Sequence, residues 1–225
     1  MEFTEFEPVY EQILADFGYG RGADEAARDL LARLTTPFDE SRLSVLTDET
    51  VAVCGAGPTL AADLREFDAD RVVAASSAAA VCREAGVPVD VYVTDLDGDP
   101  ELADVLVAEE TPVVVHAHGD NRPRLREVVP DLPDGSVLPT TQAAPVAHVR
   151  NFGGFTDGDR AAFLADHVGA TRLTFPGWSF DDPAVTETKR KKLRWAARLL
   201  AWLERRRDEQ FAVLDGVRDE VEPLP

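Results

Sequence analysis

Val51-Ala52-Val53-Cys54-Gly55-Ala56-Gly57-Pro58 joins a short apolar run to a glycine-rich turn, and a helical pattern follows it to about Phe67. This order is typical of a buried strand that enters a helix through a tight turn. Similar apolar runs alternate with helical patterns along the chain: strands at 71–74, 89–94, 112–116 and 173–175, and helices at 78–85, 101–109, 159–167 and 187–207. Strands that are apolar throughout and alternate with helices predict an α/β fold with a mostly parallel sheet flanked by helices.

The N-terminal part has a different pattern. Residues 5–17 and 23–34 place apolar side chains at helical spacing, and a glycine-rich stretch at 18–22 separates them. We therefore predict a small helical N-terminal segment at 1–45, an α/β domain that holds the functional site at 46–215, and a tail at 216–225. The end of this tail, from Glu220 onward, is expected to be frayed.

The charge of the chain bears on its habitat and partners. The chain has 225 residues and a formal net charge of −19, and its three lysines all lie between residues 189 and 192. Abundant Asp and Glu with almost no Lys are typical of a salt-saturated cytoplasm, where the Debye length is roughly 3 Å or less. The charge disfavours nucleic acid and anionic lipid, and we find neither a run of eighteen apolar residues nor a signal-peptide pattern. We expect a halophilic, cytoplasmic enzyme that binds small molecules rather than nucleic acid or membrane. Assembly of this enzyme into a homo-oligomer is compatible with the sequence.

Polar sequences follow three of the predicted strands, at the point where each strand ends. They are the glycine turn at 55–57, Thr94-Asp95-Leu96-Asp97, and His116-Ala117-His118-Gly119-Asp120. In parallel α/β sheets, ligands bind outside the carboxyl ends of the strands. We therefore expect these three segments to meet in one functional site.

The acidic turn is the strongest candidate for a metal site. Asp95, Asp97 and Asp99 alternate directly after a strand, and carboxylates this close repel one another unless a cation lies between them. Mg²⁺ prefers oxygen ligands and commonly takes one or two carboxylates together with substrate phosphates. An EF-hand loop is excluded, because its required Gly and Glu would fall at Pro100 and Leu106. The alternative is a solvated acidic loop on an acidic protein.

The glycine turn and the lysine cluster are candidates for phosphate contacts. Gly55 and Gly57 match two glycines of the dinucleotide fingerprint, but the third glycine and the later acidic residue are missing, so NAD binding is disfavoured. The turn either presents backbone N–H groups to a phosphate, or it contains glycines only because a tight turn needs small residues. Lys189 and Lys192 share one helix face; the alternatives are a solvated basic face and phosphate contact, and we favour contact because the chain has no lysine outside this cluster.

Two further motifs are ambiguous from sequence. His116-Ala117-His118-Gly119-Asp120-Asn121 is similar to the His-x-His-x-Asp-His signature of dinuclear zinc hydrolases, except that Asn121 takes the last position. A zinc-dependent hydrolase built on His116 and His118 is therefore one alternative. A non-catalytic nucleotide-binding module is another. Asp157 and Asp159 lie at the start of a predicted helix. An N-cap role would explain one of these two aspartates but not both.

Taken together, these segments resemble a known family. The glycine turn, Val93-Thr94-Asp95-Leu96-Asp97-Gly98, the segment 116–121, Thr140-Thr141-Gln142 and the segment 151–160 are similar, in that order, to the archaeal 6-hydroxymethyl-7,8-dihydropterin pyrophosphokinases. The resemblance covers roughly residues 48 to 205. That family is similar in its catalytic domain to thiamin pyrophosphokinase, which implies a Rossmann-like α/β sheet here.

The resemblance also implies a reaction and its residues. The reaction is transfer of diphosphate from ATP to the hydroxymethyl oxygen of a reduced pterin, with release of AMP, in tetrahydrofolate or tetrahydromethanopterin biosynthesis. Such transfer needs mainly positioning and charge neutralisation. Asp95 and Asp97 would hold Mg²⁺, Asp157 or Asp159 would complete the metal shell or position the hydroxyl, and Arg160 would balance phosphate charge. Contacts to the nucleotide or the pterin are expected from Gly55, Gly57, His116, His118, Asp120, Asn121, Thr141, Gln142, Lys189 and Lys192.

The chain departs from the family pattern at two places. Ser76-Ser77 stands where the resemblance leads us to expect an Asp-Gly pair after the second strand. Trp178-Ser179-Phe180 stands where a Met-Asp-Phe type of sequence is expected. Both departures concern the acceptor substrate more than the ATP chemistry.

Overall fold

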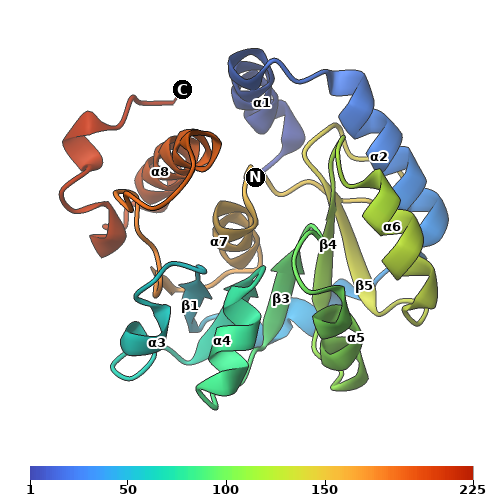
Figure 1. The fold of residues 1–225 in the computed structure, drawn as a ribbon, viewed down its shortest axis with the longest axis horizontal. Helices are drawn as coiled ribbons and strands as arrows, with labels where there is room; N and C mark the ends of the chain where they lie inside the picture. The colour runs from blue at the N-terminus through green and yellow to red at the C-terminus, as the bar shows by residue number, and fades with distance from the viewer. Residues whose placement is uncertain (225) are drawn as a thin grey trace.

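The computed structural model describes residues 1–224; Pro225, the last residue of the predicted tail, lies outside the described residues. Within this range, six parallel strands form one sheet in the order β5-β4-β3-β2-β1-β6 (Figure 1). The predicted α/β class with a parallel sheet is confirmed. The strands are β1 (Thr50–Cys54), β2 (Arg71–Ala75), β3 (Val91–Thr94), β4 (Val113–Ala117), β5 (Val137–Thr141) and β6 (Arg172–Thr174).

Helices cover both faces of this sheet. One face carries α2 (Arg21–Leu34), α3 (Leu60–Asp63), α4 (Ala78–Glu84), α5 (Pro100–Ala108) and α6 (Arg122–Val128). The other face carries α1 (Phe3–Phe17), α7 (Asp157–His167) and α8 (Glu187–Arg207). Because the chain steps from β1 to β5 in one direction, the crossover helices α3 to α6 all lie on the same face. Short 3₁₀ helices lie at Glu40–Leu46, Val129–Asp131, Ala212–Leu214 and Arg218–Glu220.

The two N-terminal helices pack on opposite faces of the sheet. Phe6, Tyr10 and Ile13 of α1 are buried in the same cluster as α7 and α8. Leu30 and Leu31 of α2 are buried with α6 and the outer strands. The division of the chain at residue 45 stays a prediction, and the first 34 residues contribute to the hydrophobic clusters on both faces of the sheet.

Some elements differ from the sequence prediction. The hydrophobic pattern of the sequence did not predict α6. It indicated only the polar end of β5. Pro139 lies inside β5, which is tolerated because β5 is an edge strand of the sheet. The prediction of a frayed end was wrong for Leu224, which is 5% exposed and packs into the core, and whose carbonyl accepts a hydrogen bond from Arg205 at 2.8 Å.

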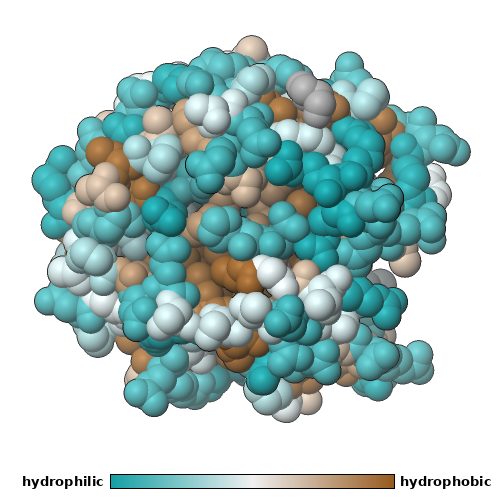
Figure 2. All heavy atoms as spheres, turned by 180° about the vertical axis from the view of Figure 1, so that it is seen from behind, coloured by the Kyte–Doolittle hydropathy of each residue, from teal (hydrophilic) through white to brown (hydrophobic). Residues whose placement is uncertain are grey.

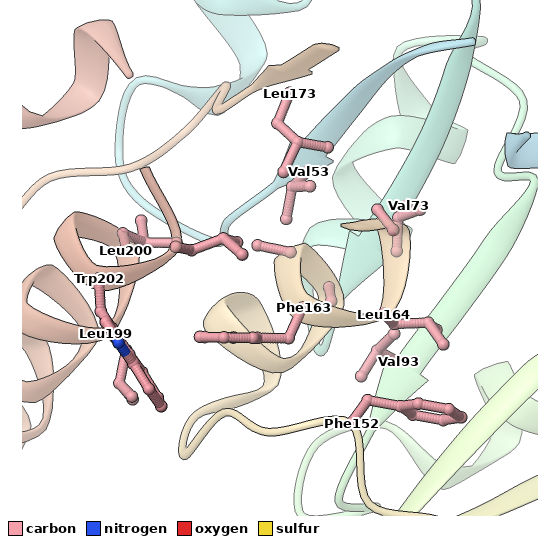
Figure 3. Packing of buried hydrophobic residues seen from close by; sticks show 14 of the residues in the cluster. Val53, Val73, Val93, Phe152, Phe163, Leu164, Leu173, Leu199, Leu200 and Trp202 are labelled. Atoms are coloured by element: carbon pink, nitrogen blue, oxygen red, sulfur yellow. The ribbon is translucent and has the colours of Figure 1, made fainter. Parts of the chain in front are cut away.

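Valines from neighbouring strands form the floor of the larger core. Val53, Val73 and Val93 point to the same face of the sheet, against α7 (Figure 3). Phe163 of α7 lies between these strands and α8, with its ring 6.1 Å from the ring of Trp202. This packing fixes α7, whose first residues reach the carboxyl ends of the strands.

Replacing Val73 with Ala is expected to lower the free energy of unfolding by about 2 kcal/mol. The side chain is fully buried, and losing two methyl groups removes about 0.8 kcal/mol of burial each, with a further cost for the cavity left behind. Val105→Ala on α5 is the matched control, because Val105 is 41% exposed. Denaturant unfolding of both variants measures the difference; equal values would contradict the packing described.

The outer surface is mostly hydrophilic. Seen from behind, hydrophilic residues cover most of the molecule, and hydrophobic ones show mainly in the gaps between them (Figure 2). None of the helices in residues 1–224 is both long enough and apolar enough to span a membrane.

Candidate active site

A cavity of about 590 Å³ opens at the carboxyl ends of β1 to β5. Its volume lies in the range of small-molecule sites, roughly 300–1,000 Å³. Most of the residues expected from sequence line it: Gly55, Gly57, Asp95, Asp97, His116, His118, Asp120, Gln142, Asp157, Lys189 and Lys192. The others support the loops behind this wall: Asn121, Thr141, Asp159 and Arg160.

The acidic turn follows β3, near the middle of the sheet. The Asp95 carboxylate accepts a hydrogen bond from the N–H of Asp97 at 3.0 Å, and Leu96 between them has φ 66°. This turn places Asp95, Asp97 and His118 so that one ligand atom of each lies within 4.8 Å of the others. Two carboxylates beside an open cavity fit the oxygen-ligand preference of Mg²⁺.

His118 supports the turn. Its Nδ1 accepts the N–H of Asp120 at 3.4 Å, which leaves the ring proton on Nε2, and Nε2 lies 3.6 Å from the Asp95 carboxylate. The imidazole therefore presents its N–H side to Asp95. This arrangement suits a residue that orients a carboxylate.

Negative charge accumulates around the turn. Burial tends to raise the pKa of Asp95, but the nearby His118 imidazole and the hydrogen bond from the Asp97 N–H outweigh burial and hold this pKa below its ordinary value. Burial and the charge of Asp95 raise the pKa of Asp97. Burial, together with the charge of Asp95, raises the pKa of Asp157 to about 8, against the opposing charge of Arg160. A bound cation would relieve this repulsion.

The start of α7 brings Asp157 to the cavity. Asp159 accepts hydrogen bonds from the N–H of Thr156 at 3.1 Å and from its hydroxyl at 2.6 Å. The Thr156 side chain in turn accepts the N–H of Asp159, which completes a capping box with Thr156 as the N-cap. The buried Arg160 donates to the Phe155 carbonyl at 3.1 Å. Both side chains hold the loop before α7, and only Asp157 of the two aspartates faces the cavity.

Asn121 joins the ends of two strands. Its amide nitrogen donates to the carbonyls of Asp95 at 2.8 Å and of His116 at 2.7 Å, while its oxygen accepts the N–H of His118 at 3.0 Å. Thr141 similarly uses its hydroxyl to accept the N–H of Ala143 at 3.1 Å. These residues position the loops after β3, β4 and β5.

The glycines at 55 and 57 are required by a close backbone contact that the sequence did not reveal. The N–H groups of Gly55 and Gly57 donate to the carbonyls of Pro176 at 2.9 Å and Gly177 at 2.7 Å. These two groups are therefore engaged with the backbone and do not cradle a phosphate. A Cβ at Gly57 would lie 2.3 Å from the Gly177 carbonyl oxygen, so only glycine permits this approach.

The close approach places Trp178 in the cavity wall. The indole N–H donates to the Val53 carbonyl at 2.9 Å, and a Cβ at Gly158 would lie 2.6 Å from the ring. Trp178 was singled out in the sequence only as a departure from the family pattern. The other departure, Ser76-Ser77, also lines the cavity, and Ser76 has φ 51°.

The lysine cluster divides into two parts. Lys189 and Lys192 line the cavity from the start of α8. Lys191 points elsewhere: its ammonium lies 2.9 Å from the Asp16 carboxylate and 4.6 Å from the centre of the Phe17 ring. Of the three lysines, Lys189 and Lys192 are therefore the two that line the cavity.

Asp24 of α2 is a cavity residue that sequence reasoning missed. It is 3% exposed and accepts hydrogen bonds from the Tyr10 hydroxyl at 2.8 Å, the Gly119 N–H at 2.8 Å and the Gln142 amide at 2.7 Å. In sequence it looks like an ordinary acidic residue in the first turn of a helix. Two of its three partners are 95 and 118 residues away, so no local pattern marks it.

Comparisons with known proteins place the chain in one family. The profile of the family described as "6-hydroxymethylpterin diphosphokinase MptE-like" matches residues 26–184. Similar proteins named 6-hydroxymethyl-7,8-dihydropterin pyrophosphokinase include one from Pyrococcus furiosus, 40% identical over 91% of this chain and 95% of the relative. Another from Methanothermobacter thermautotrophicus is 38% identical over 88% and 94%, and one from Methanocaldococcus jannaschii is 32% identical over 94% and 99%. The resemblance read from the motifs is thereby confirmed, and this chain belongs to the 6-hydroxymethylpterin diphosphokinase MptE-like family.

Proposed function

We propose that this chain is a cytoplasmic, Mg²⁺-dependent enzyme that transfers a diphosphate from ATP to the hydroxymethyl oxygen of 6-hydroxymethyl-7,8-dihydropterin and releases AMP. The observation that carries the proposal is the cavity in which Asp95, Asp97 and Asp157 face Lys189 and Lys192. Carboxylates that hold a metal and lysines that meet phosphate are what phosphoryl transfer requires of a protein. The three relatives named as pyrophosphokinases support the same reaction.

The residues take the following roles in this proposal. Asp95 and Asp97 hold Mg²⁺, which, when bound, supplies charge neutralisation at the phosphate oxygens. Asp157, with its raised pKa, completes the metal shell or orients the pterin hydroxyl. Lys189 and Lys192 bind the transferred phosphates. Asp159, Arg160 and Asn121 hold the loops that carry these groups.

The reaction is tested directly with the purified chain, ATP, MgCl₂ and 6-hydroxymethyl-7,8-dihydropterin in concentrated KCl. AMP and pterin diphosphate are expected to appear in equal amounts. AMP release no greater than in the pterin-free control would contradict the proposed acceptor. ATP binding without any turnover would instead favour a non-catalytic nucleotide-binding module.

The geometry does not favour the zinc hydrolase. His116 is buried with Nδ1 against Thr140, and His118 is the one histidine that joins the carboxylates among residues 1–224. Soft or borderline ions such as Zn²⁺ prefer several nitrogen or sulfur ligands. Metal analysis of protein purified without added metal separates the two, since a hydrolase would retain stoichiometric zinc and a labile Mg²⁺ site would not.

Replacing Lys192 with Met is expected to lower kcat/KM for ATP by about 10- to 100-fold. A hydrogen bond to a charged phosphate contributes about 1.5–3 kcal/mol, and each 1.4 kcal/mol is a factor of ten. Steady-state kinetics with ATP as the varied substrate measure the effect. An unchanged kcat/KM would remove Lys192 from the phosphate site.

Lys191→Met is the matched control for this variant. The residue is adjacent and chemically identical, but it pairs with Asp16 on α1. Its loss is expected to cost at most about 1 kcal/mol of stability and to leave the kinetics for ATP unchanged.

A further inference from the structure

His116 carries a buried polar atom without a partner. The side chain is 2% exposed, lines the cavity, and has no hydrogen-bond partner for Nε2 among the described residues. Its other ring nitrogen, Nδ1, lies 3.3 Å from the Thr140 hydroxyl oxygen. A buried polar atom without a partner costs about 1–3 kcal/mol, so such an atom at a cavity wall points to a ligand.

The hydrogen bonds of Thr140 determine which kind of ligand atom can bond to Nε2 of His116. The Thr140 hydroxyl donates its single proton to the Val115 carbonyl at 3.1 Å. It therefore accepts from His116, so the ring proton of His116 is on Nδ1. Nε2 then carries a lone pair and no hydrogen, and it requires an N–H or O–H donor from the ligand.

A second acceptor lies on the same side of the cavity. Asp24 accepts one hydrogen bond at Oδ1, from Gly119, and a carboxylate oxygen can accept two. Gln142, the neighbour of Thr141 at the end of β5, donates one of its two amide hydrogens to the other Asp24 oxygen. This part of the wall therefore presents two acceptors, His116 Nε2 and Asp24 Oδ1, beside the Gln142 amide, and the two acceptors suit a ligand edge with adjacent donors.

The order of the strands separates this region from the other end of the cavity. His116 and Gln142 follow β4 and β5, whereas Gly55 and Ser76 follow β1 and β2. The acidic turn after β3 lies between them. In-line transfer places the acceptor hydroxyl and the departing AMP on opposite sides of the transferred group. The two substrates should therefore lie on opposite sides of Asp95 and Asp97.

We propose that the β4–β5 side of the cavity holds the aminopyrimidinone ring of the pterin, with His116 Nε2 and Asp24 Oδ1 accepting hydrogen bonds from its amino group and ring N–H. This assignment rests on the proposed function. The pterin edge has an amino group next to a ring N–H, which are adjacent donors. Adenine instead places its amino group beside a ring nitrogen lone pair, which an acceptor wall repels. The nucleotide therefore occupies the β1–β2 side, near Trp178.

His116→Phe tests the assignment, because it keeps a flat ring and removes the acceptor. The dissociation constants of 6-hydroxymethylpterin and of ATP are measured separately on the full chain, by pterin fluorescence and by calorimetry. We expect pterin binding to weaken about tenfold or more, with ATP binding changed less than about twofold. His148→Phe is the matched control; His148 contacts Thr35 away from the cavity, and both constants should stay unchanged. Weaker ATP binding with unchanged pterin binding would overturn the assignment.

A second measurement uses the unaltered protein and does not depend on the variant folding. A 6-hydroxymethylpterin analogue without the 2-amino group should bind about tenfold more weakly than the parent compound. Equal affinities would also overturn the assignment. If the unaltered protein binds no pterin and releases no AMP, the proposed function itself fails. Pterin turnover with equal affinities for the analogue would reject only the placement of the ring.

Discussion

Asp97→Asn is expected to lower kcat for diphosphate transfer by about a thousandfold while the fold stays intact. Asp97 is exposed to the cavity and its carboxylate makes no hydrogen bond that supports another loop among residues 1–224. Its proposed contribution is one metal ligand and one negative charge. Loss of metal-ion stabilisation costs several kcal/mol in the transition state, and about 4 kcal/mol corresponds to three orders of magnitude.

The measurement compares kcat at saturating ATP and pterin over a range of Mg²⁺ concentrations. Asp104→Asn is the control for the lost charge, because Asp104 is exposed on α5 and lies outside the cavity wall. Both variants should show the same thermal unfolding as the unaltered chain. Near-normal turnover of Asp97→Asn would exclude Asp97 as a metal ligand.

Asp24→Ala is expected to lower the free energy of unfolding by about 3–5 kcal/mol and to impair the site at the same time. The change leaves the Tyr10 hydroxyl, the Gly119 N–H and the Gln142 amide without their acceptor. A buried donor without a partner costs about 1–3 kcal/mol, and three of them lie at this position. The loop after β4 and the end of β5 lose their common anchor.

Denaturant unfolding checks the stability, and the pterin assay at a temperature where the variant is folded checks the site. Asp29→Ala on the same helix is the control. Asp29 is half-exposed at its side chain and pairs with the partly buried Arg28, so its loss should cost about 1 kcal/mol. If Asp24→Ala were as stable as Asp29→Ala, the three hydrogen bonds would have no net effect on stability.

Much of the candidate site was predictable because parallel sheets gather their carboxyl ends at one edge. The turns at Asp95, His118 and Gly55 each follow a buried strand, so their meeting in one cavity follows from the strand pattern alone. The segment after β5 was only partly predicted from the sequence. Its strand contains Pro139 and was predicted only at its polar end.

Other features could not be read from local sequence. The glycines at 55 and 57 match a phosphate-binding turn, yet their N–H groups meet the backbone at 176–177. Asp159 looks equivalent to Asp157, but the capping geometry turns it into the loop. Both outcomes depend on segments that become neighbours only after folding.

The sequence by itself determined the α/β class, the acidic turn and the family to which the chain belongs, because each depends on short patterns and their order. Hydrophobic periodicity is local, and a strand end carries its motif wherever the strand lies in the sheet. The strand order, the role of Asp24, and the free Nε2 of His116 were decided by the tertiary structure alone. Each of these depends on hydrogen bonds and packing between residues far apart in the chain, which no local pattern encodes.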